Sequence, residues 1–193
     1  DGRAWLSVVP FVNVDLRPAA LPRGAGFALP ELNLRTYVRH RGRPGVYFFS
    51  LDADGALGVL GARLFHHLPY YFARIDVDAE DDRVTFASRR RHPGARPVAF
   101  RATYGPDGER FEADRGSLSA FLTARDRYYT EDPSGATRYA TVEHERWPLY
   151  PATARIGPDE LFRGNWFDPP EADPTFLYSP GVDTVASTSR RAE

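Results

Sequence analysis

The stretch Glu31-Leu32-Asn33-Leu34-Arg35-Thr36-Tyr37-Val38 alternates with a period of two residues along its whole length. Successive side chains of a β-strand point to opposite faces, so this period predicts a strand over 31–39. One face of that strand carries a carboxylate, an amide, a guanidinium and a phenol, from Glu31, Asn33, Arg35 and Tyr37. Together these groups suit the lining of a binding site, and an ordinary water-facing strand is the alternative.

The composition indicates a globular protein with no preference for charged partners. A chain of 193 residues, 42% hydrophobic and 13% aromatic, is long enough for a single domain over 1–193 with a sizeable core. Its net charge of -1 gives no electrostatic reason to bind nucleic acid or an anionic membrane. No apolar run is long enough to span a membrane. We therefore expect neither partner, and leave a homo-oligomer open.

Two residue types are missing, and each absence excludes a class of chemistry. The sequence has no Cys, so disulfides, thiol catalysis and thiolate metal sites are excluded. All 25 basic residues are Arg, and a guanidinium cannot form the imine that a lysine forms with a carbonyl compound. The cytoplasm is the default location. Because the sequence opens with Asp1 instead of Met, we expect a further N-terminal segment.

The neighbours of the opening stretch predict a hairpin followed by a helix. The short polar turn 40–45 leads into a second strand, 46–51. Asp52 is placed to cap a helix over 53–67, whose apolar face would hold Leu57, Leu60 and Leu64. An apolar strand over 5–14 comes before the hairpin. Its Pro10 favours a sheet edge or a bulge.

The rest of the chain reads mainly as short strands separated by turns. Strands are predicted at 70–77, 83–91, 98–104, 138–145 and 150–156, helices at 117–126 and near 158–162, and a tail at 168–193. This pattern predicts a β-rich α+β fold, a barrel or sandwich with a few flanking helices.

Four segments carry a resemblance to a known family: ELNLRTYV (31–38), PGVYFFSLDAD (44–54), LPYY (68–71) and VEHERWPL (142–149). They resemble the uncharacterised YqjF-like proteins of the acetoacetate decarboxylase-like superfamily. The resemblance implies a strongly curved antiparallel β-barrel or cone around a central cavity. It also places Glu31 where the decarboxylases keep a glutamate that lines the cavity.

The same resemblance shows that the decarboxylases' catalytic lysines have no counterpart in this sequence. The decarboxylases end their crossover helix in Tyr-Pro-Lys-Lys, where one lysine forms the Schiff base and the other depresses its pKa. The matching residues here are Leu68, Pro69, Tyr70 and Tyr71. A phenol can donate a hydrogen bond or pass a proton, but it cannot form an imine. We therefore expect the cavity without Schiff-base chemistry.

The candidate site consists of Glu31 as catalytic acid or base and six ligand-binding side chains. Arg35 would hold a carboxylate by a bidentate fork, and the alternative is a structural salt bridge from Arg35 to Glu31. Neighbours on a strand alternate, so either Tyr70 or Tyr71 should face inward, with aromatic packing as the alternative. The ligand-binding candidates are Asn33, Arg35, Tyr37, Tyr70, Tyr71 and His144.

The histidines do not predict a metal site. His144 is a candidate for the cavity lining or for a structural hydrogen bond. The adjacent His66 and His67 do not share a helix face, and no H-E-x-x-H spacing is present. We expect no metal and no cofactor.

Three functions follow from these observations. The first is a protein that binds a small organic carboxylate or carbonyl compound. The second is a lysine-independent enzyme that acts on a keto acid with Glu31 as acid or base. The third is a structural or regulatory module whose interior is filled by its own side chains.

Overall fold

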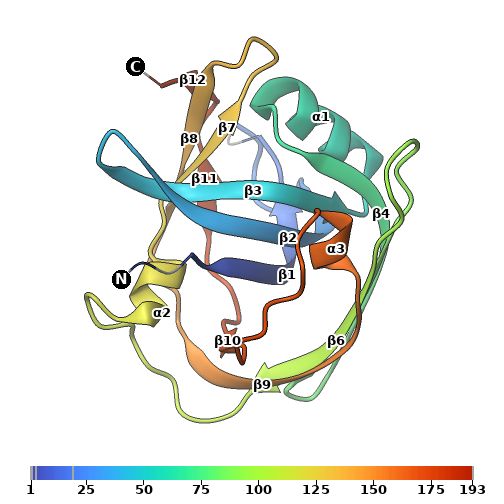
Figure 1. The fold of residues 1–193 in the computed structure, drawn as a ribbon, viewed down its shortest axis with the longest axis vertical. Coiled ribbons are helices and arrows are strands. Elements are labelled where there is room, and N and C mark those ends of the chain that lie inside the picture. The colour runs from blue at the N-terminus through green and yellow to red at the C-terminus, as the bar shows by residue number, and fades with distance from the viewer. Residues whose placement is uncertain (1, 3, 19, 193) are drawn as a thin grey trace.

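The chain folds mainly into β-strands of one branched, curved sheet, with a few short helices around it (Figure 1). The structure is a computed structural model and describes residues 2, 4–18 and 20–192. The strands are β1 Leu6–Leu16, β2 Phe27–His40, β3 Arg43–Ala53, β4 Tyr70–Glu80, β5 Arg83–Arg90, β6 Ala99–Pro106, β7 Arg127–Glu131, β8 Thr137–His144, β9 Tyr150–Asp159, β10 Leu177–Tyr178, β11 Thr184–Ala186 and β12 Arg190–Arg191. The helices are α1 Ala56–His66, α2 Leu118–Thr123 and α3 Leu161–Gly164.

The predicted hairpin is confirmed as β2 and β3. Its turn has positive φ at both Arg41 (47°) and Gly42 (80°), the backbone twist that suits a two-residue hairpin connection. Pairing runs from His40 opposite Arg43 to Glu31 opposite Ala53, with one irregularity after Leu34. β1 pairs only with β2 among the described strands, so Pro10 lies in an edge strand as predicted.

β3 is the strand at which the sheet divides. One side pairs with β2, and the other pairs in parallel with two strands: β4 along 51–53 and β7 along 46–47. The expectation of a wholly antiparallel sheet is therefore wrong at these two contacts. The chain returns from β3 to β4 through α1, and such a crossover brings strands together in parallel.

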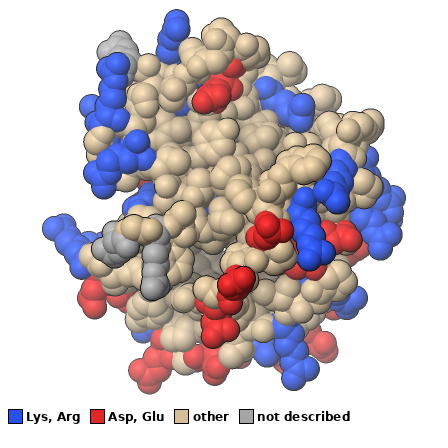
Figure 2. Space-filling model, viewed as in Figure 1, with Lys and Arg blue, Asp and Glu red and all other residues tan. Residues whose placement is uncertain are grey.

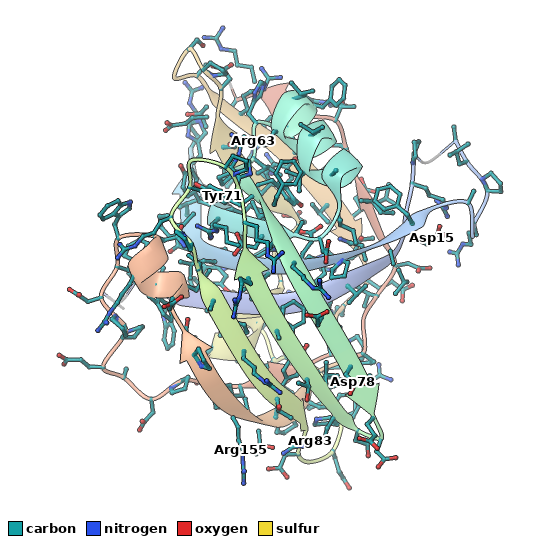
Figure 3. All side chains as sticks on the ribbon, turned by 90° about the vertical axis from the view of Figure 1, so that its right-hand side faces the viewer. Asp15, Arg63, Tyr71, Asp78, Arg83 and Arg155 are labelled. Atoms are coloured by element: carbon teal, nitrogen blue, oxygen red, sulfur yellow. The ribbon has the colours of Figure 1, made fainter. Side chains whose placement is uncertain are left out.

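The sheet stays open, so the expected closed barrel is also wrong. Its longest path runs β10-β9-β6-β5-β4-β3-β7-β8-β11, and β2 with β1 leaves this path at β3 (Figure 1). β4, β5, β6 and β9 form the antiparallel branch that faces the viewer in Figure 3. The expected tail is docked, because short strands β10, β11 and β12 pair with β9 and β8.

Two hydrophobic cores lie on opposite faces of β2 and β3. The first core gathers Leu29, Leu51, Val59, Tyr70 and Tyr128 under α1. The second combines leucines of β2 with residues of the antiparallel branch and α3, and it includes Leu32, Leu34, Ile75, Phe86, Phe100 and Leu161. Because both faces of β2 are covered, its polar side chains at 31 and 33 are buried along with its leucines.

Helix α1 packs with a different face from the one predicted. Leu60 and Leu64 are exposed, whereas Val59 is fully buried; the side chain of Leu57 lies outside the described residues. The cause is close packing against Leu29: an added Cβ at Gly58 would lie 2.8 Å from a methyl carbon of Leu29. The face that contains Gly58 lets the helix approach β2 closely, so this face packs against the sheet and Leu60 and Leu64 point to solvent.

Asp52 does not cap α1, contrary to the sequence prediction, because it lies in β3. Its carboxylate accepts a hydrogen bond of 2.7 Å from Nε of Arg90, and the two side chains are 1% and 3% exposed. This pair joins β3 to β5 inside the second core. Charged side chains otherwise lie largely around the margin of the face shown in Figure 2. In the described chain, no helix has the length and apolarity needed to span a membrane.

The Asp52–Arg90 pair predicts a strongly asymmetric response to substitution. We expect Arg90→Met to destabilise the fold by about 3–5 kcal/mol, because it leaves a buried carboxylate without its cation. The double variant Asp52→Leu with Arg90→Met should recover most of that loss. Urea unfolding of both variants provides the measurement, and equal destabilisation in the two would contradict the prediction.

Candidate functional site

The polar row of β2 faces the first core, under α1. Glu31 and Asn33 are 3% and 4% exposed, and Arg35 and Tyr37 are half-buried. Glu31 lies opposite Ala53 and Asn33 opposite Leu51 in the hairpin register. The row is therefore inside the protein, and a purely water-facing strand is ruled out for these two residues.

Glu31 is held by two hydrogen-bond donors from other strands. Asn13 donates from Nδ2 to Oε1 over 2.7 Å, and the Tyr70 hydroxyl donates to Oε2 over 2.9 Å. Burial raises the pKa of Glu31 to about 7, against the lowering effect of the bonds from Tyr70 and Asn13. Near neutral pH this carboxyl can therefore both release and accept a proton.

Tyr70 occupies the inward position of the tyrosine pair. It is 8% exposed and pairs with Leu51, so its ring is directed to the same face as Glu31. Burial raises the pKa of Tyr70 well above its usual value, and the charge of Glu31 and the bond to it raise it further. The phenol thus stays protonated and acts as a donor.

A second buried tyrosine lies in the same core as Glu31 and Tyr70. Tyr128 from β7 belongs to the same core, and its hydroxyl forms a hydrogen bond with Nδ1 of His66 at the end of α1. Burial raises the pKa of Tyr128, whereas burial lowers that of His66. Both groups are therefore biased towards their neutral forms, and they add polarity to the core without adding charge.

Asn33 has an acceptor that the protein does not use. Its Oδ1 is buried and has no hydrogen-bond partner among the described residues. A buried amide oxygen without a partner costs on the order of 1–3 kcal/mol. Such an atom is a candidate contact for water or for a ligand between Glu31 and Arg35.

Arg35 and Tyr37 are anchored at the opposite end of the row by α2. Both donate to the carbonyl oxygen of Leu122, over 3.3 Å from Nη2 and 3.0 Å from the hydroxyl. The Tyr37 hydroxyl also lies 2.7 Å from Oγ of Ser7 in β1. Arg35 does not form the predicted alternative salt bridge with Glu31, whose two oxygens bond to Asn13 and Tyr70.

The remaining predicted residues lie apart from Glu31. Tyr71 pairs with Asp52 on the other face of the sheet, where the Arg90 guanidinium lies 4.1 Å from its ring centroid. Figure 3 shows Tyr71 close to Arg63, near α1. His144 lies at the end of β8, with its ring nitrogens near the carbonyl oxygens of Glu145 (2.6 Å) and Arg125 (3.2 Å).

An open groove of about 530 Å³ lies at the division of β3. Strand pairing on this side of β3 ends at Tyr47 with β7 and resumes at Leu51 with β4. The groove is lined there by Phe48, Leu68 and Pro69, and Pro69 directly precedes Tyr70. Since Phe48 also packs in the core of Tyr70, the groove is an approach from solvent towards that core.

Sequence reasoning missed three residues that the fold brings to this region: Asn13, Tyr128 and Arg125. Asn13 had a visible signal, because it is one of two polar residues, with Ser7, in the apolar stretch WLSVVPFVNV. Tyr128 and Arg125 gave none, because only the pairing of β7 with β3 and the placement of α2 bring them near β2. No cluster of three potential metal ligands occurs within the described part of the chain.

Comparison with known proteins identifies relatives for nearly the whole chain. Residues 1–183 match the model of the DUF2071 family, described as an uncharacterised conserved protein. The uncharacterised protein YqjF of Bacillus subtilis (strain 168) is 40% identical over 186 residues, which cover 96% of this chain and 76% of that protein.

Solved structures show the fold. An acetoacetate decarboxylase-like enzyme from Sphingomonas wittichii RW1 superposes with a TM-score of 0.50 at 13% identity, covering 88% of this chain and 71% of that one. An acetoacetate decarboxylase from Legionella pneumophila gives 0.48 at 14% identity, covering 86% of this chain and 64% of that one. The match to this superfamily's fold confirms the fold predicted from the sequence, except for the closed, wholly antiparallel barrel.

The raised pKa of Glu31 predicts a pH-dependent loss of stability. The folded protein keeps the proton up to about pH 7, whereas the unfolded chain releases it near 4.5. The stability due to this proton is complete below 4.5 and falls as the pH rises through 7, by up to roughly 3 kcal/mol. Urea titrations at pH 5 and pH 8 should show this fall in the wild type.

Glu31→Gln provides the comparison, because it keeps the shape and cannot ionise. Other groups with shifted pKa values, such as Asp52, remain in both proteins, so the difference between the two isolates Glu31. The same pH dependence in both proteins would show that Glu31 does not titrate in this range.

Proposed function

The chain belongs to the DUF2071 family, and from its interior we propose that it binds a small organic carboxylate or carbonyl compound and moves a proton on it through Glu31. Tyr70 is the donor to the ligand's carbonyl oxygen, and Arg35 is the anchor for an acidic group. The reaction does not use a Schiff base. The acetoacetate decarboxylase-like fold contributes the scaffold to this proposal and not the chemistry.

The observation that carries the proposal is the environment of the Glu31 carboxyl. Burial brings its pKa to about 7, while Asn13 and Tyr70 hold both oxygens in fixed positions. General acids and bases work best when their pKa lies near the operating pH. A carboxyl with these properties inside a fold is a candidate for proton transfer, whereas a purely packing position would favour an apolar side chain.

The proposed step is the reversible enolisation of a carbonyl compound. Glu31 as carboxylate takes a proton from the carbon next to the carbonyl, and that C–H bond breaks. Its electron pair forms the C=C bond of the enolate, while negative charge moves to the carbonyl oxygen. Tyr70, released from Glu31, donates to this oxygen and stabilises the charge. Return of the proton from Glu31 restores the ligand.

Access to this pair is proposed through the groove at the division of β3. The groove has the volume of a typical small-molecule site, and its lining mixes apolar residues such as Phe48 and Leu68 with charged ones such as Arg63 and Glu131. Phe48 separates the groove from the core that holds Tyr70. A rotation of this one side chain, or a small separation of β4 from β7, would open a path to Glu31.

A structural role is the second candidate, and one observation favours it. Both oxygens of Glu31 already have partners, and Tyr70 is almost fully buried. A carboxyl that accepts two bonds from β1 and β4 also ties these strands to β2. In that case substitution would lower stability and no ligand would depend on Glu31.

Deuterium exchange separates the two candidates. Keto acids incubated with the protein in D₂O should exchange the protons next to the carbonyl, as followed by proton NMR. Glu31→Gln and Tyr70→Phe should each slow this exchange by about a hundredfold or more, because one lacks the base and the other the oxyanion donor. Tyr104→Phe, a half-buried tyrosine beside the other core, should leave the rate unchanged.

Exchange at equal rates in the wild type and Glu31→Gln would remove Glu31 from the chemistry. No exchange with any acid, combined with a large loss of stability in Glu31→Gln, would establish the structural role instead. Borohydride in the presence of a keto acid should give no covalent adduct on residues 1–193, because this stretch contains no lysine.

A further inference from the structure

Arginine side chains converge on Tyr37 at the α2 end of the polar row. The Arg35 guanidinium lies 5.9 Å from the Tyr37 ring centroid, and that of Arg125 lies 5.5 Å from the same ring. Arg125 also lies 4.6 Å from the ring of Phe121 in α2. Two cations thus share one aromatic ring, although like charges at this spacing repel each other.

Neither arginine of this pair forms an ion pair with a carboxylate of the described chain, and neither does Arg39. Burial lowers the pKa of Arg125; Arg35 and Arg39 lower it further, and Tyr37 and Asp126 act against them. The guanidinium nevertheless stays charged in the working range of a protein. The positive charge at this end of β2 is therefore offset only at a distance, by Asp126, and by no ion pair among the described residues.

Both guanidinium groups also keep donors without acceptors. Nε of Arg35 and Nε of Arg125 are buried and have no hydrogen-bond partner in the part of the chain that the structure describes. Their other recorded bonds go to main-chain carbonyls: Arg35 to Leu122, and Arg125 to Ala124 over 2.8 Å. These carbonyls orient the side chains without neutralising them. An oxyanion would supply both the missing acceptor and the missing charge.

From this geometry we infer that Arg35 and Arg125 together form the carboxylate subsite of an elongated oxo acid, beside Tyr37. This inference rests on the proposed function for the other end of the ligand. The inference adds Arg125 to the proposed site. Arg125 determines specificity for an acid and takes no part in proton transfer.

The spacing along β2 sets the length of this ligand. Glu31 and Arg35 are four residues apart on one strand, so their Cα atoms lie about 13 Å apart. Arg35 reaches to Leu122 and Tyr37, which lie beyond it from Glu31. A β-keto acid has only two bonds between its carboxyl and carbonyl carbons and cannot reach both sites. Several further carbon–carbon bonds must separate the two groups, and Asn33 Oδ1 lies between them.

Calorimetric titration with a graded series of acids tests the inference. The probes are 3-oxobutanoate, 5-oxohexanoate and 7-oxooctanoate, with octanoate lacking the ketone and 2-octanone lacking the acid. Affinity should rise by at least tenfold from the shortest to the longest oxo acid. Arg125→Gln should weaken 7-oxooctanoate and octanoate by about tenfold to a hundredfold, the effect of one charge-assisted bond, and leave 2-octanone unchanged.

Arg127→Gln is the matched control. Arg127 is also half-buried and also lies over a tyrosine ring, 4.5 Å from the Tyr139 centroid, but it has no part in the Tyr37 cluster. Its substitution should change none of these affinities. Without ligand, Arg125→Gln should melt no lower than the wild type, because the substitution relieves repulsion from Arg35.

The possible outcomes separate this inference from the proposed function. Octanoate binding that depends on Arg125, with no proton exchange on any keto acid, would support the anion subsite and refute the chemistry at Glu31. Equal affinity along the series would refute the elongated ligand. Unchanged acid affinity in Arg125→Gln, or no acid binding at all, would overturn the inference, and a lower melting temperature alone would assign Arg125 a structural role.

Discussion

The division of β3 between two parallel neighbours is the constraint on which the rest of the structure depends. β4 and β7 both require the same edge of β3, so each takes one end and the middle is left without a strand. The two branches curve away on opposite sides, and β2 becomes buried on both faces. The polar residues of β2 are therefore enclosed by the topology itself, and each must find a partner inside the protein or from a ligand.

The partners that β2 finds differ at its two ends. At Glu31 the surrounding strands provide neutral hydrogen-bond donors, and the buried carboxyl keeps its proton up to about pH 7. At Arg35 the neighbours are a second arginine and main-chain carbonyls. A guanidinium does not lose its proton in this environment, so it stays charged. The Glu31 end of the row is thus uncharged while the carboxyl is protonated, whereas the Arg35 end remains positively charged. In the proposed function, the Arg35 end would bind the acidic group of the ligand and the Glu31 end would exchange the proton.

Local patterns predicted much of this fold, and contacts between distant segments supplied the rest. The period of two in 31–38 and the turn after it were sufficient for the β2–β3 hairpin. The face of α1 was predicted wrongly, because leucine spacing carries no information about how closely Gly58 lets the helix approach Leu29. Asp52 resembles a helix cap locally, but pairing with Arg90, 38 residues away, keeps it in a strand. The inward position of one tyrosine followed from alternation, whereas Asn13 and Arg125 depended on pairings that no local pattern encodes.

Replacing a lysine with a tyrosine changes what a buried glutamate can do. A lysine ammonium beside Glu31 would stabilise the carboxylate and lower its pKa, which would leave a weak base at neutral pH. The Tyr70 phenol donates one hydrogen bond and brings no charge, so burial remains the dominant effect and the pKa of Glu31 stays high. A tyrosine at this position therefore leaves Glu31 a stronger base than a lysine would. Under the proposed function, a fold that elsewhere supports covalent activation of a carbonyl compound would here support direct removal of a proton from it, and the Tyr70 hydroxyl would donate a hydrogen bond to the negative charge on the carbonyl oxygen.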